Sequence, residues 1–380
     1  MEHIVGMTLH GTNLSFAAAE SNTGRIVHEA RFDGPFKRTG NKTPDGQEEV
    51  VADRIHADRP LITRVSAYAN DSYRTFLEGA AEKGIDRSDP VGISFAGKTW
   101  TKGGIHYVTG GNTPRRFCET GEGGIPLLLE DPVESAAGND AQASYNAQAL
   151  VYRHVLGIDP ETTAYIVLGT GFGGGCRYQD ALFEVGHHKF EFFPQELALP
   201  CDHESGEKTT CAENYGSGRG LAATATHIIE LYRARRADTL NKIGDFVGTE
   251  DKEGLTELIK GSPLEGLDSV SAEDVMRNKD DPFAAWIINL GAIAVSSALA
   301  HASMDFGIER YGLGESVALN NPAYVQMIAG YVQERMGRSN FHPDGVAVEM
   351  TPLKDAGMYG ALIQVVDPNI KVLFLAAHLP

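Results

Sequence analysis

Residues 164–176 read AYIVLGTGFGGGC, an apolar run followed by the most glycine-dense window of the chain. Its first half is β-branched and apolar, which predicts a strand over Thr163–Leu168. The glycines that follow let backbone N–H groups surround an anion without interference from a Cβ atom, and Thr170 adds a hydroxyl donor. Residues 176–185 (CRYQDALFEV) then alternate as a second strand does. The window therefore predicts a hairpin whose glycine turn binds phosphate.

Two other interpretations of this window stay open. It satisfies the dinucleotide-binding pattern G-x-G-x-x-G through Gly169, Gly171 and Gly174. That pattern needs a helix directly afterwards and an acid ~20 residues further on. The window can also be a glycine-rich hairpin turn without a ligand. The alternation after Cys176 favours a phosphate-binding turn of the actin-like ATPase kind over a Rossmann unit.

The composition limits the class of protein. The chain has 380 residues, and single cores stop growing near ~250–300 residues, so we expect two domains. The net charge of −18 repels polyanions, which argues against a nucleic-acid or anionic-membrane partner. The N-terminus shows no secretion signal, and the most apolar stretch, 286–302, is shorter than the ~20 residues of a membrane span. We therefore expect a cytoplasmic protein.

Periodicity and turn residues predict the order of elements along the chain. Short alternating runs indicate a three-stranded meander over 5–9, 14–19 and 26–32. The other predicted elements are a loop over 33–60, helices over 60–83, 139–155 and 217–235, a strand over 91–95 and a helix that starts at Asp281-Pro282. The composition changes from strand-rich to helix-rich near residue 137, which predicts a domain boundary there.

A region rich in acids, histidines and cysteines follows the predicted hairpin. Two imidazoles and two thiolates there would close a structural Zn²⁺ site, because these are the ligands that zinc prefers. The four candidate ligands are His187, Cys201, His203 and Cys211, and His188 could replace His187. Their spacing is not that of a standard finger, so ordinary cysteines and surface histidines remain the alternative. Glu184 and Glu213 flank this region and could accept hydrogen bonds from sugar hydroxyls, or could be solvated surface charges.

Five motifs follow one another along the chain: Asn139-Asp140-Ala141, the glycine window 169–175, Glu184 to His187, Cys211 to Gly218, and Ala356 to Ala361. Together they resemble the ROK family of sugar kinases and repressors, within the actin/hexokinase ATPase superfamily. The resemblance implies an α/β, two-domain actin-like ATPase (ribonuclease H-like) fold with a cleft between the domains. The smaller domain would comprise residues 1–137 plus 357–380, and the larger domain residues 138–356.

The resemblance also implies roles for individual residues. Asp140 would be the general base that takes the proton from the attacking sugar hydroxyl. The residues implied to bind the sugar are Asn112, Asn139, Glu184, His187 and Glu213. The residues implied to bind ATP are Gly11, Thr12, Gly169, Thr170, Gly171, Gly173 and Gly314. The implied cofactors are ATP, Mg²⁺ and a structural Zn²⁺ held in part by His187, and the implied assembly is a homodimer.

This chain departs from the family pattern at three places. The first phosphate loop of the family reads D-x-G-G-T, whereas Thr8 and His10 replace its acid and first glycine here. The cysteine-rich loop C-x-C-x₄-C becomes Cys201-x-His203-x₇-Cys211, and the adenine-side G-G-G is reduced to Gly312-Leu313-Gly314 followed by Glu315. An apolar run in residues 368–380 extends past the usual end, and we expect it to pack on the fold.

Three functions follow from these patterns. The leading hypothesis is ATP-dependent phosphorylation of a hexose or amino-hexose hydroxyl. The second is a catalytically weak or inactive kinase-like sugar sensor, favoured by Thr8 and His10, without a DNA-binding domain because strand one starts within five residues of Met1. The third, a Rossmann oxidoreductase, predicts a helix after Gly174.

Overall fold

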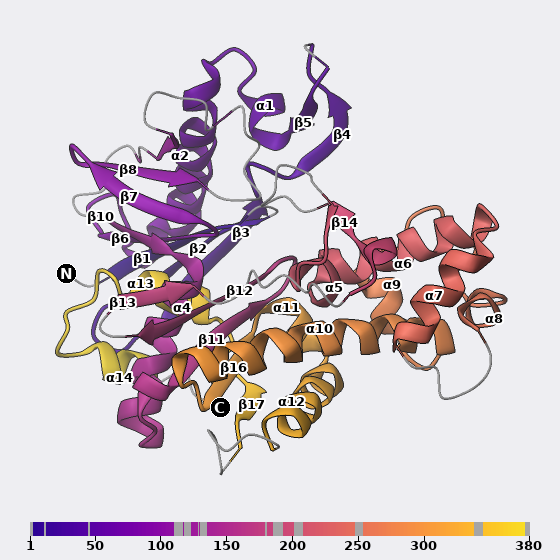
Figure 1. Ribbon diagram of the computed structural model, residues 1–380. Coiled ribbons are helices and arrows are strands. Elements are labelled where there is room, and N and C mark those ends of the chain that lie inside the picture. Colours follow the sequence, from indigo (N-terminus) through magenta and orange to yellow (C-terminus); the bar gives the residue numbers. More distant parts are fainter. Residues whose placement is uncertain are drawn as a thin grey trace. The chain divides into compact units, whose positions relative to one another are not determined.

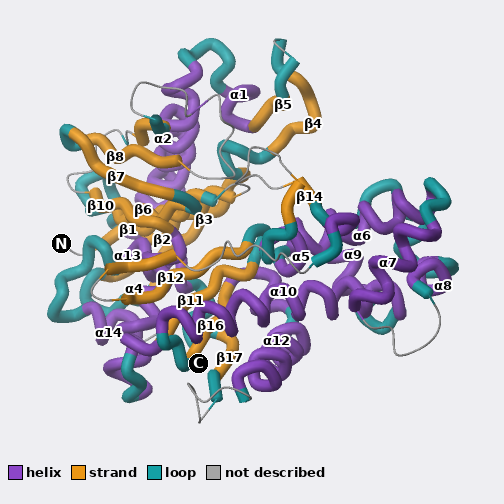
Figure 2. Tube along the Cα trace, viewed as in Figure 1, coloured by secondary structure: helices purple, strands orange, loops and turns teal. Residues whose placement is uncertain are grey.

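The computed structural model describes residues 3–10, 13–44, 46–109, 117, 123–127, 129, 135–178, 181–184, 193–200, 208–247, 254–337 and 345–376. The chain divides into two compact units, Met1–Pro160 with Asp355–Pro380, and Glu161–Lys354. Figures 1 and 2 show a mixed α/β chain in which each unit contains a sheet and several helices. The first compact unit ends at residue 160, whereas the sequence predicted a domain boundary near residue 137. The two domains with the predicted bounds stay a prediction.

The first unit is built on a five-stranded sheet in the order β10-β6-β1-β2-β3. The strands are β1 (His3–Leu9), β2 (Asn13–Glu20), β3 (Ile26–Asp33), β6 (Val91–Phe95) and β10 (Ser135–Asn139). β1, β2 and β3 pair antiparallel, and β1, β6 and β10 pair parallel. The predicted meander and the predicted strand over 91–95 are therefore confirmed.

One face of this sheet accepts a helix closely because two neighbouring strands carry glycine there. Gly6 and Gly92 are paired in register. A Cβ atom at Gly92 would overlap the carbonyl oxygen of Ala361, so no larger residue fits there, and one at Gly6 would lie 2.8 Å from Sδ of Met358, whose side chain would have to move. These contacts come from α13 (Ala356–Leu362), which also packs on α4 (Asp140–Val151).

The opposite face of the sheet holds the aromatic core of the first unit. Met7 alternates with Gly6 and pairs with Phe16, so both side chains point away from α13. The Phe16 ring stacks on Tyr73 and Phe76 at centroid distances of 5.7 and 5.3 Å, and both partners belong to α2 (Leu61–Ala80). The helix predicted over 60–83 is confirmed by α2. Its aromatic residues hold it against this face of the sheet.

The C-terminal run also packs on this unit, as expected. It forms α14 (Lys371–Ala376), which contacts α4. Its Phe374 is buried and meets the Tyr359 ring edge-on at 6.4 Å.

The predicted loop over 33–60 is wrong in part. The chain forms β4 (Arg38–Lys42), β5 (Glu48–Val50) and α1 (Val51–Ile55) there. Its polar residues bond to one another: Thr39 donates to Glu49 at 2.7 Å, and Asp53 is buried against Arg64 at 2.9 Å. Polar side chains can therefore build a small folded element where their pattern indicates a solvated loop.

A separate small sheet contains β7 (Lys98–Lys102), β8 (Ile105–Thr109) and β9 (Ile125–Leu127).

The second unit repeats the strand order of the first. The order of strands in its sheet is β13-β12-β11-β16-β17. β11, β12 and β13 pair antiparallel, whereas β11, β16 and β17 pair parallel. The strands are β11 (Thr163–Leu168), β12 (Phe172–Tyr178), β13 (Ala181–Glu184), β16 (Arg310–Gly314) and β17 (Ala347–Met350). β14 (Leu199–Pro200) and β15 (Lys208–Thr209) form a separate short pair.

The described part of the second unit also contains eight α-helices. They are α5 (Glu213–Gly216), α6 (Gly218–Arg233), α7 (Ala237–Val247), α8 (Leu255–Ile259), α9 (Ala272–Arg277), α10 (Pro282–Phe306), α11 (Glu315–Asn320) and α12 (Pro322–Met336). Asp281 caps α10 by accepting from the amide of Ala284 at 3.0 Å, which confirms the predicted start.

The most apolar segment of the chain is longer than expected. α10, the long orange helix in Figure 1, has 25 residues and packs on α12. By length and apolarity alone it is the helix, among the described residues, that could cross a membrane. Of its most apolar window, 83% is buried inside the protein, which is the burial of a core helix.

Candidate functional site

The glycine window forms the predicted hairpin in the second unit. β11 and β12 pair antiparallel from Ala164↔Cys176 to Leu168↔Phe172, so residues 169–171 make the turn. Gly173 lies in β12 opposite Val167 rather than in the turn. A strand, not a helix, follows Gly174, so the Rossmann interpretation of this window is wrong.

The first turn of α6 holds this glycine turn in place. The amide of Gly218 donates to the carbonyl of Gly169 at 2.8 Å, and the amide of Arg219 donates to the carbonyl of Thr170 at 3.1 Å. Ser217 caps the helix by accepting from the amide of Gly220 at 3.0 Å. These first amides of α6 are therefore engaged in shaping the turn, and Thr170 at its tip is exposed.

Glu213 lies against the same turn as a buried carboxylate. Its residue exposure is 3%, and Nη2 of Arg219 donates to its Oε1 at 2.8 Å. A Cβ atom at Gly171 would come within 2.9 Å of that oxygen, which explains why this turn position is glycine. The alternative that Glu213 is a solvated surface charge is wrong. A buried carboxylate needs a cation or hydrogen bonds, and Arg219 supplies both.

A second acidic residue, Glu315, lies against the turn directly after β16. Glu315 has a φ of 69°, in the left-handed region that favours glycine. A Cβ atom at Gly169 would lie 3.2 Å from the Cβ of Glu315. A Cβ atom at Gly314 would overlap the hydroxyl of Tyr165, so packing alone accounts for that glycine. The residue directly after Gly314 thus has a backbone conformation typical of glycine but carries an acidic side chain.

Asp140 occupies the first position of α4 in the first unit. Asn139 caps this helix, because its side chain accepts from the amide of Gln142 at 3.0 Å and donates to the carbonyl of Gly97 at 2.8 Å. Oδ1 of Asp140 accepts from the amide of Ala141 at 2.8 Å. The positive end of the helix favours an ionised carboxylate at this place.

The end of β1 approaches the same carboxylate. Nδ1 of His10 lies 3.7 Å from Oδ2 of Asp140. Thr8 is buried in β1 between Ser15 and Ser94 of the neighbouring strands, so a neutral hydroxyl stands where the family pattern has an acid.

The predicted site residues fall into two groups. Asn139 and Asp140 belong to the first unit; Glu184, Glu213, Gly314 and the glycine turn belong to the second. The structure describes Glu184 as the end of β13 but not its side chain. The other predicted site residues lie outside the described residues: Gly11, Thr12, Asn112, His187, Cys201 and His203.

Metal binding stays a prediction. Within the described part of the chain, no group of three or more His, Cys, Asp or Glu side chains could hold a metal ion. Of the four zinc candidates only Cys211 is described, and it is buried.

Two site contacts were not predicted from the sequence. The first is the contact of Arg219 with Glu213, which the position of Arg219 directly after the Ser217-Gly218 motif could have indicated. The second is the approach of His10 to Asp140, because the sequence shows only that His10 replaces a glycine of the family pattern.

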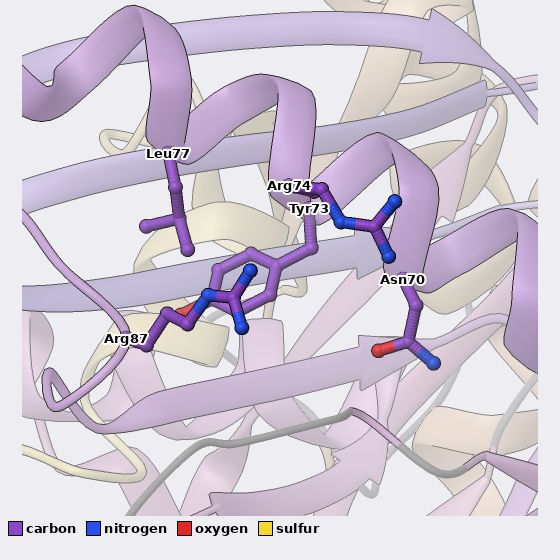
Figure 3. A pocket seen from close by; sticks show the side chains of 5 residues that line it. All are labelled: Asn70, Tyr73, Arg74, Leu77 and Arg87. Carbon is purple, nitrogen blue, oxygen red and sulfur yellow. The ribbon is translucent and has the colours of Figure 1, made fainter.

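A surface hollow in the first unit does not include any predicted site residue. It is lined by residues of α2 and of the loop after it (Figure 3): Asn70, Tyr73, Arg74, Leu77 and Arg87. We therefore assign it no part in the site.

Comparison with solved structures identifies the fold. The chain is 18% identical to a ROK family glucokinase from Streptomyces griseus solved with glucose and AMPPNP, with 95% of this chain and 98% of that chain covered and a TM-score of 0.58. It is 18% identical to a ROK hexokinase from Thermus thermophilus, covering 95% and 97% with a TM-score of 0.53. A ROK family transcriptional regulator, a homologue of the E. coli MLC protein, is 18% identical, covering 99% and 79% with a TM-score of 0.55.

No family model and no curated protein sequence matches the chain, so the likeness lies in the fold. The likeness extends over 95% of this chain and so includes both five-stranded sheets. The chain therefore has the α/β fold of the ROK family sugar kinases and regulators, the actin-like ATPase fold that its motifs predicted.

Proposed function

We propose that this chain transfers the γ-phosphoryl group of ATP to a hydroxyl of a hexose or amino-hexose. The observation that carries the proposal is Asp140, a carboxylate fixed at the N-terminus of α4 in a fold shared with sugar kinases. A carboxylate that stays ionised can take a hydroxyl proton as the oxygen attacks phosphorus. Action in the cytoplasm and assembly as a homodimer are part of the same proposal.

Asn139, Glu213 and the glycine turn have assigned roles in this proposal. Asn139 fixes the direction of α4 and with it the Asp140 carboxylate. Glu213, oriented by Arg219, would accept hydrogen bonds from sugar hydroxyls. The exposed Thr170 at the glycine turn would contact ATP phosphates, because its neighbours carry no Cβ atom.

Magnesium has no assigned step here. A hydrated Mg²⁺ ion prefers carboxylate oxygens. The residue at the acid position of the first loop is Thr8, whose buried hydroxyl does not meet that preference. A metal that arrived with ATP would supply positive charge beside the phosphates; the residues described above would bind and orient the substrates and accept the proton.

The test is a coupled assay of ADP release over a panel of hexoses and amino-hexoses. We expect turnover on at least one sugar, and a loss of at least ~100-fold in kcat for Asp140→Asn. Asn146→Ala, at an exposed position of the same helix, is the matched control and should retain wild-type activity. No turnover on any sugar, or equal kcat for D140N and the wild type, would contradict the proposal.

A sugar-binding sensor is the second candidate, and Thr8 favours it. Loss of the acid at this position weakens ATP-dependent phosphoryl transfer more than it weakens sugar binding. Calorimetry distinguishes the two functions: a sensor binds a sugar and shows no binding of ATP, whereas the kinase binds both.

A further inference from the structure

Arg219 brings a guanidinium group to the glycine turn between β11 and β12. Its amide donates to the carbonyl of Thr170 at 3.1 Å, and its Nη2 donates to Oε1 of Glu213 at 2.8 Å. A Cβ atom at Gly171 would lie only 2.9 Å from that same oxygen. The backbone of Arg219 is therefore bonded to the turn, and its charged end is one hydrogen bond away from an oxygen that touches the turn.

The N-terminus of α6 contributes little positive charge to a ligand at this turn. A helix N-terminus beside a glycine turn usually binds phosphate through its first amides. Here those amides have acceptors within the protein: Gly218 and Arg219 donate to the carbonyls of the turn, Gly220 donates to Oγ of Ser217 at 3.0 Å, and Leu221 donates to the carbonyl of Ser217 at 2.8 Å. The positive charge for a phosphate bound at the turn would have to come from a side chain.

Arg219 is the basic residue closest to the turn among the described elements that meet there. β11 and α5 contain no lysine or arginine. Arg177 in β12 and Arg310 in β16 lie at the ends of their strands that pair near the start of β11, opposite to the turn, and Arg233 is the last residue of α6. The half-buried Glu315 adds an acid beside Gly169, which increases the need for a cation at this place.

The pair of Arg219 and Glu213 is anchored on one side and accessible on the other. The Glu213 side chain is 4% exposed, whereas the Arg219 side chain is 33% exposed. A guanidinium group carries five N–H donors in one plane, so it can contact a carboxylate and a phosphate at the same time. The buried carboxylate holds the guanidinium in one direction, which lowers the entropy that a ligand loses by ordering it.

We propose that Arg219 binds the outer phosphates of ATP, together with the exposed Thr170 at the tip of the turn. The inference rests on the proposed function, because it takes ATP as the ligand of the glycine turn. It assigns to a side chain of the second unit the positive charge that helix amides supply at other phosphate sites. The ion pair then connects Glu213, which we assign to the sugar, with the residue that binds phosphate.

Calorimetry with ATP, ADP and AMP at one fixed concentration of salt and Mg²⁺ tests this contact. In Arg219→Gln we expect the affinity for ATP to fall at least about tenfold, because charged hydrogen bonds are lost, and the affinity for AMP to fall less than about twofold. A purely structural role of Arg219 would weaken the binding of all three nucleotides by the same factor. Equal losses for ATP and AMP therefore overturn the proposal.

Two further variants complete the experiment. Arg236→Gln makes the same change of charge at an exposed position of the same unit, so it should bind all three nucleotides as the wild type does. Arg219→Lys decides if R219Q does not fold, because it keeps a cation beside Glu213. A lysine lacks the planar fork, so the affinity of R219K for ATP should fall at least about threefold with AMP binding unchanged. An ATP affinity of R219K equal to that of the wild type overturns the proposal.

Binding and turnover separate this inference from the proposed function. A loss of affinity in R219Q that grows with the number of phosphates supports the role of Arg219 even when no sugar is turned over. Turnover of a sugar, with equal ATP affinities of R219Q and the wild type, supports the kinase and overturns the role of Arg219. A wild type that does not bind ATP contradicts both.

Discussion

Gly360 lets α13 approach α4 closely, and replacing it with alanine tests this contact. A methyl group there would overlap the carbonyl of Ala143 and lie 2.8 Å from the amide nitrogen of Ser144. Both obstacles are backbone, which cannot rotate away as a side chain can. The two helices must move apart, and α4 carries Asp140 at its first position.

The effect of Gly360→Ala on the free energy of unfolding is the cost of overpacking minus the gain in helix propensity. Overpacking of a well-filled interior costs ~1–3 kcal/mol, and a clash with backbone belongs at the upper end. Alanine gains ~1 kcal/mol over glycine in a helix. Gly360→Ala should therefore lower the free energy of unfolding of the first unit by ~2 kcal/mol. With an m-value of ~2 kcal/mol/M, the urea midpoint falls by ~1 M.

Gly330→Ala is the matched control with the opposite expected sign. Gly330 is an exposed position of α12, and a Cβ atom added there would have no other atom within 4 Å. Only the helix propensity acts there, so the free energy of unfolding of the second unit should rise by ~0.5–1 kcal/mol.

The chain allows each unit to be followed separately in urea. Of its two tryptophans, Trp100 lies in β7 of the first unit and Trp286 in α10 of the second. Fluorescence of Trp286→Phe reports the first unit, and fluorescence of Trp100→Phe reports the second. An unchanged or raised midpoint of the first unit in G360A would refute the close-packing argument, as would a lowered midpoint of the second unit in G330A.

Three further outcomes follow from the second unit. Arg219→Met should lower its free energy of unfolding by ~3 kcal/mol, because the buried carboxylate of Glu213 loses its cation; a urea midpoint equal to that of Arg219→Lys would contradict this. Glu315→Gly should raise its thermal midpoint, since it removes ~1 kcal/mol of left-handed backbone strain, and a lower midpoint would argue that the carboxylate stabilises the turn. Burial raises the pKa of Cys176 to about 11, so its thiol stays protonated at pH 8, and peptide mapping should find it alkylated only after unfolding.

Local patterns were sufficient for elements whose signals lie close together in the sequence. The hairpin at 163–178 followed from alternation around glycines, and the starts of α4 and α10 followed from the cap residues Asn139 and Asp281. These signals act over a few residues, because a cap or a turn is closed by its own neighbours.

Contacts between distant segments were not visible in the sequence. The burial of Glu213 depends on how α5 and α6 meet at the glycine turn, and the neighbour of Asp140 depends on the order of strands in the first sheet. The hairpin within 33–60 was missed because its polar residues bond to one another, which a composition rich in charge does not reveal.

The two sheets allow one comparison that the sequence did not offer. Each contains a strand paired antiparallel with the strand that follows it in the chain: β1 with β2 in the first unit and β11 with β12 in the second. The second turn keeps its glycines, and neighbouring groups fill the space that a side chain would need. The equivalent turn of the first unit starts with His10, whose imidazole contacts Asp140. The two segments therefore differ in chemistry: glycines leave the backbone of one accessible, whereas the other begins with an imidazole beside a carboxylate.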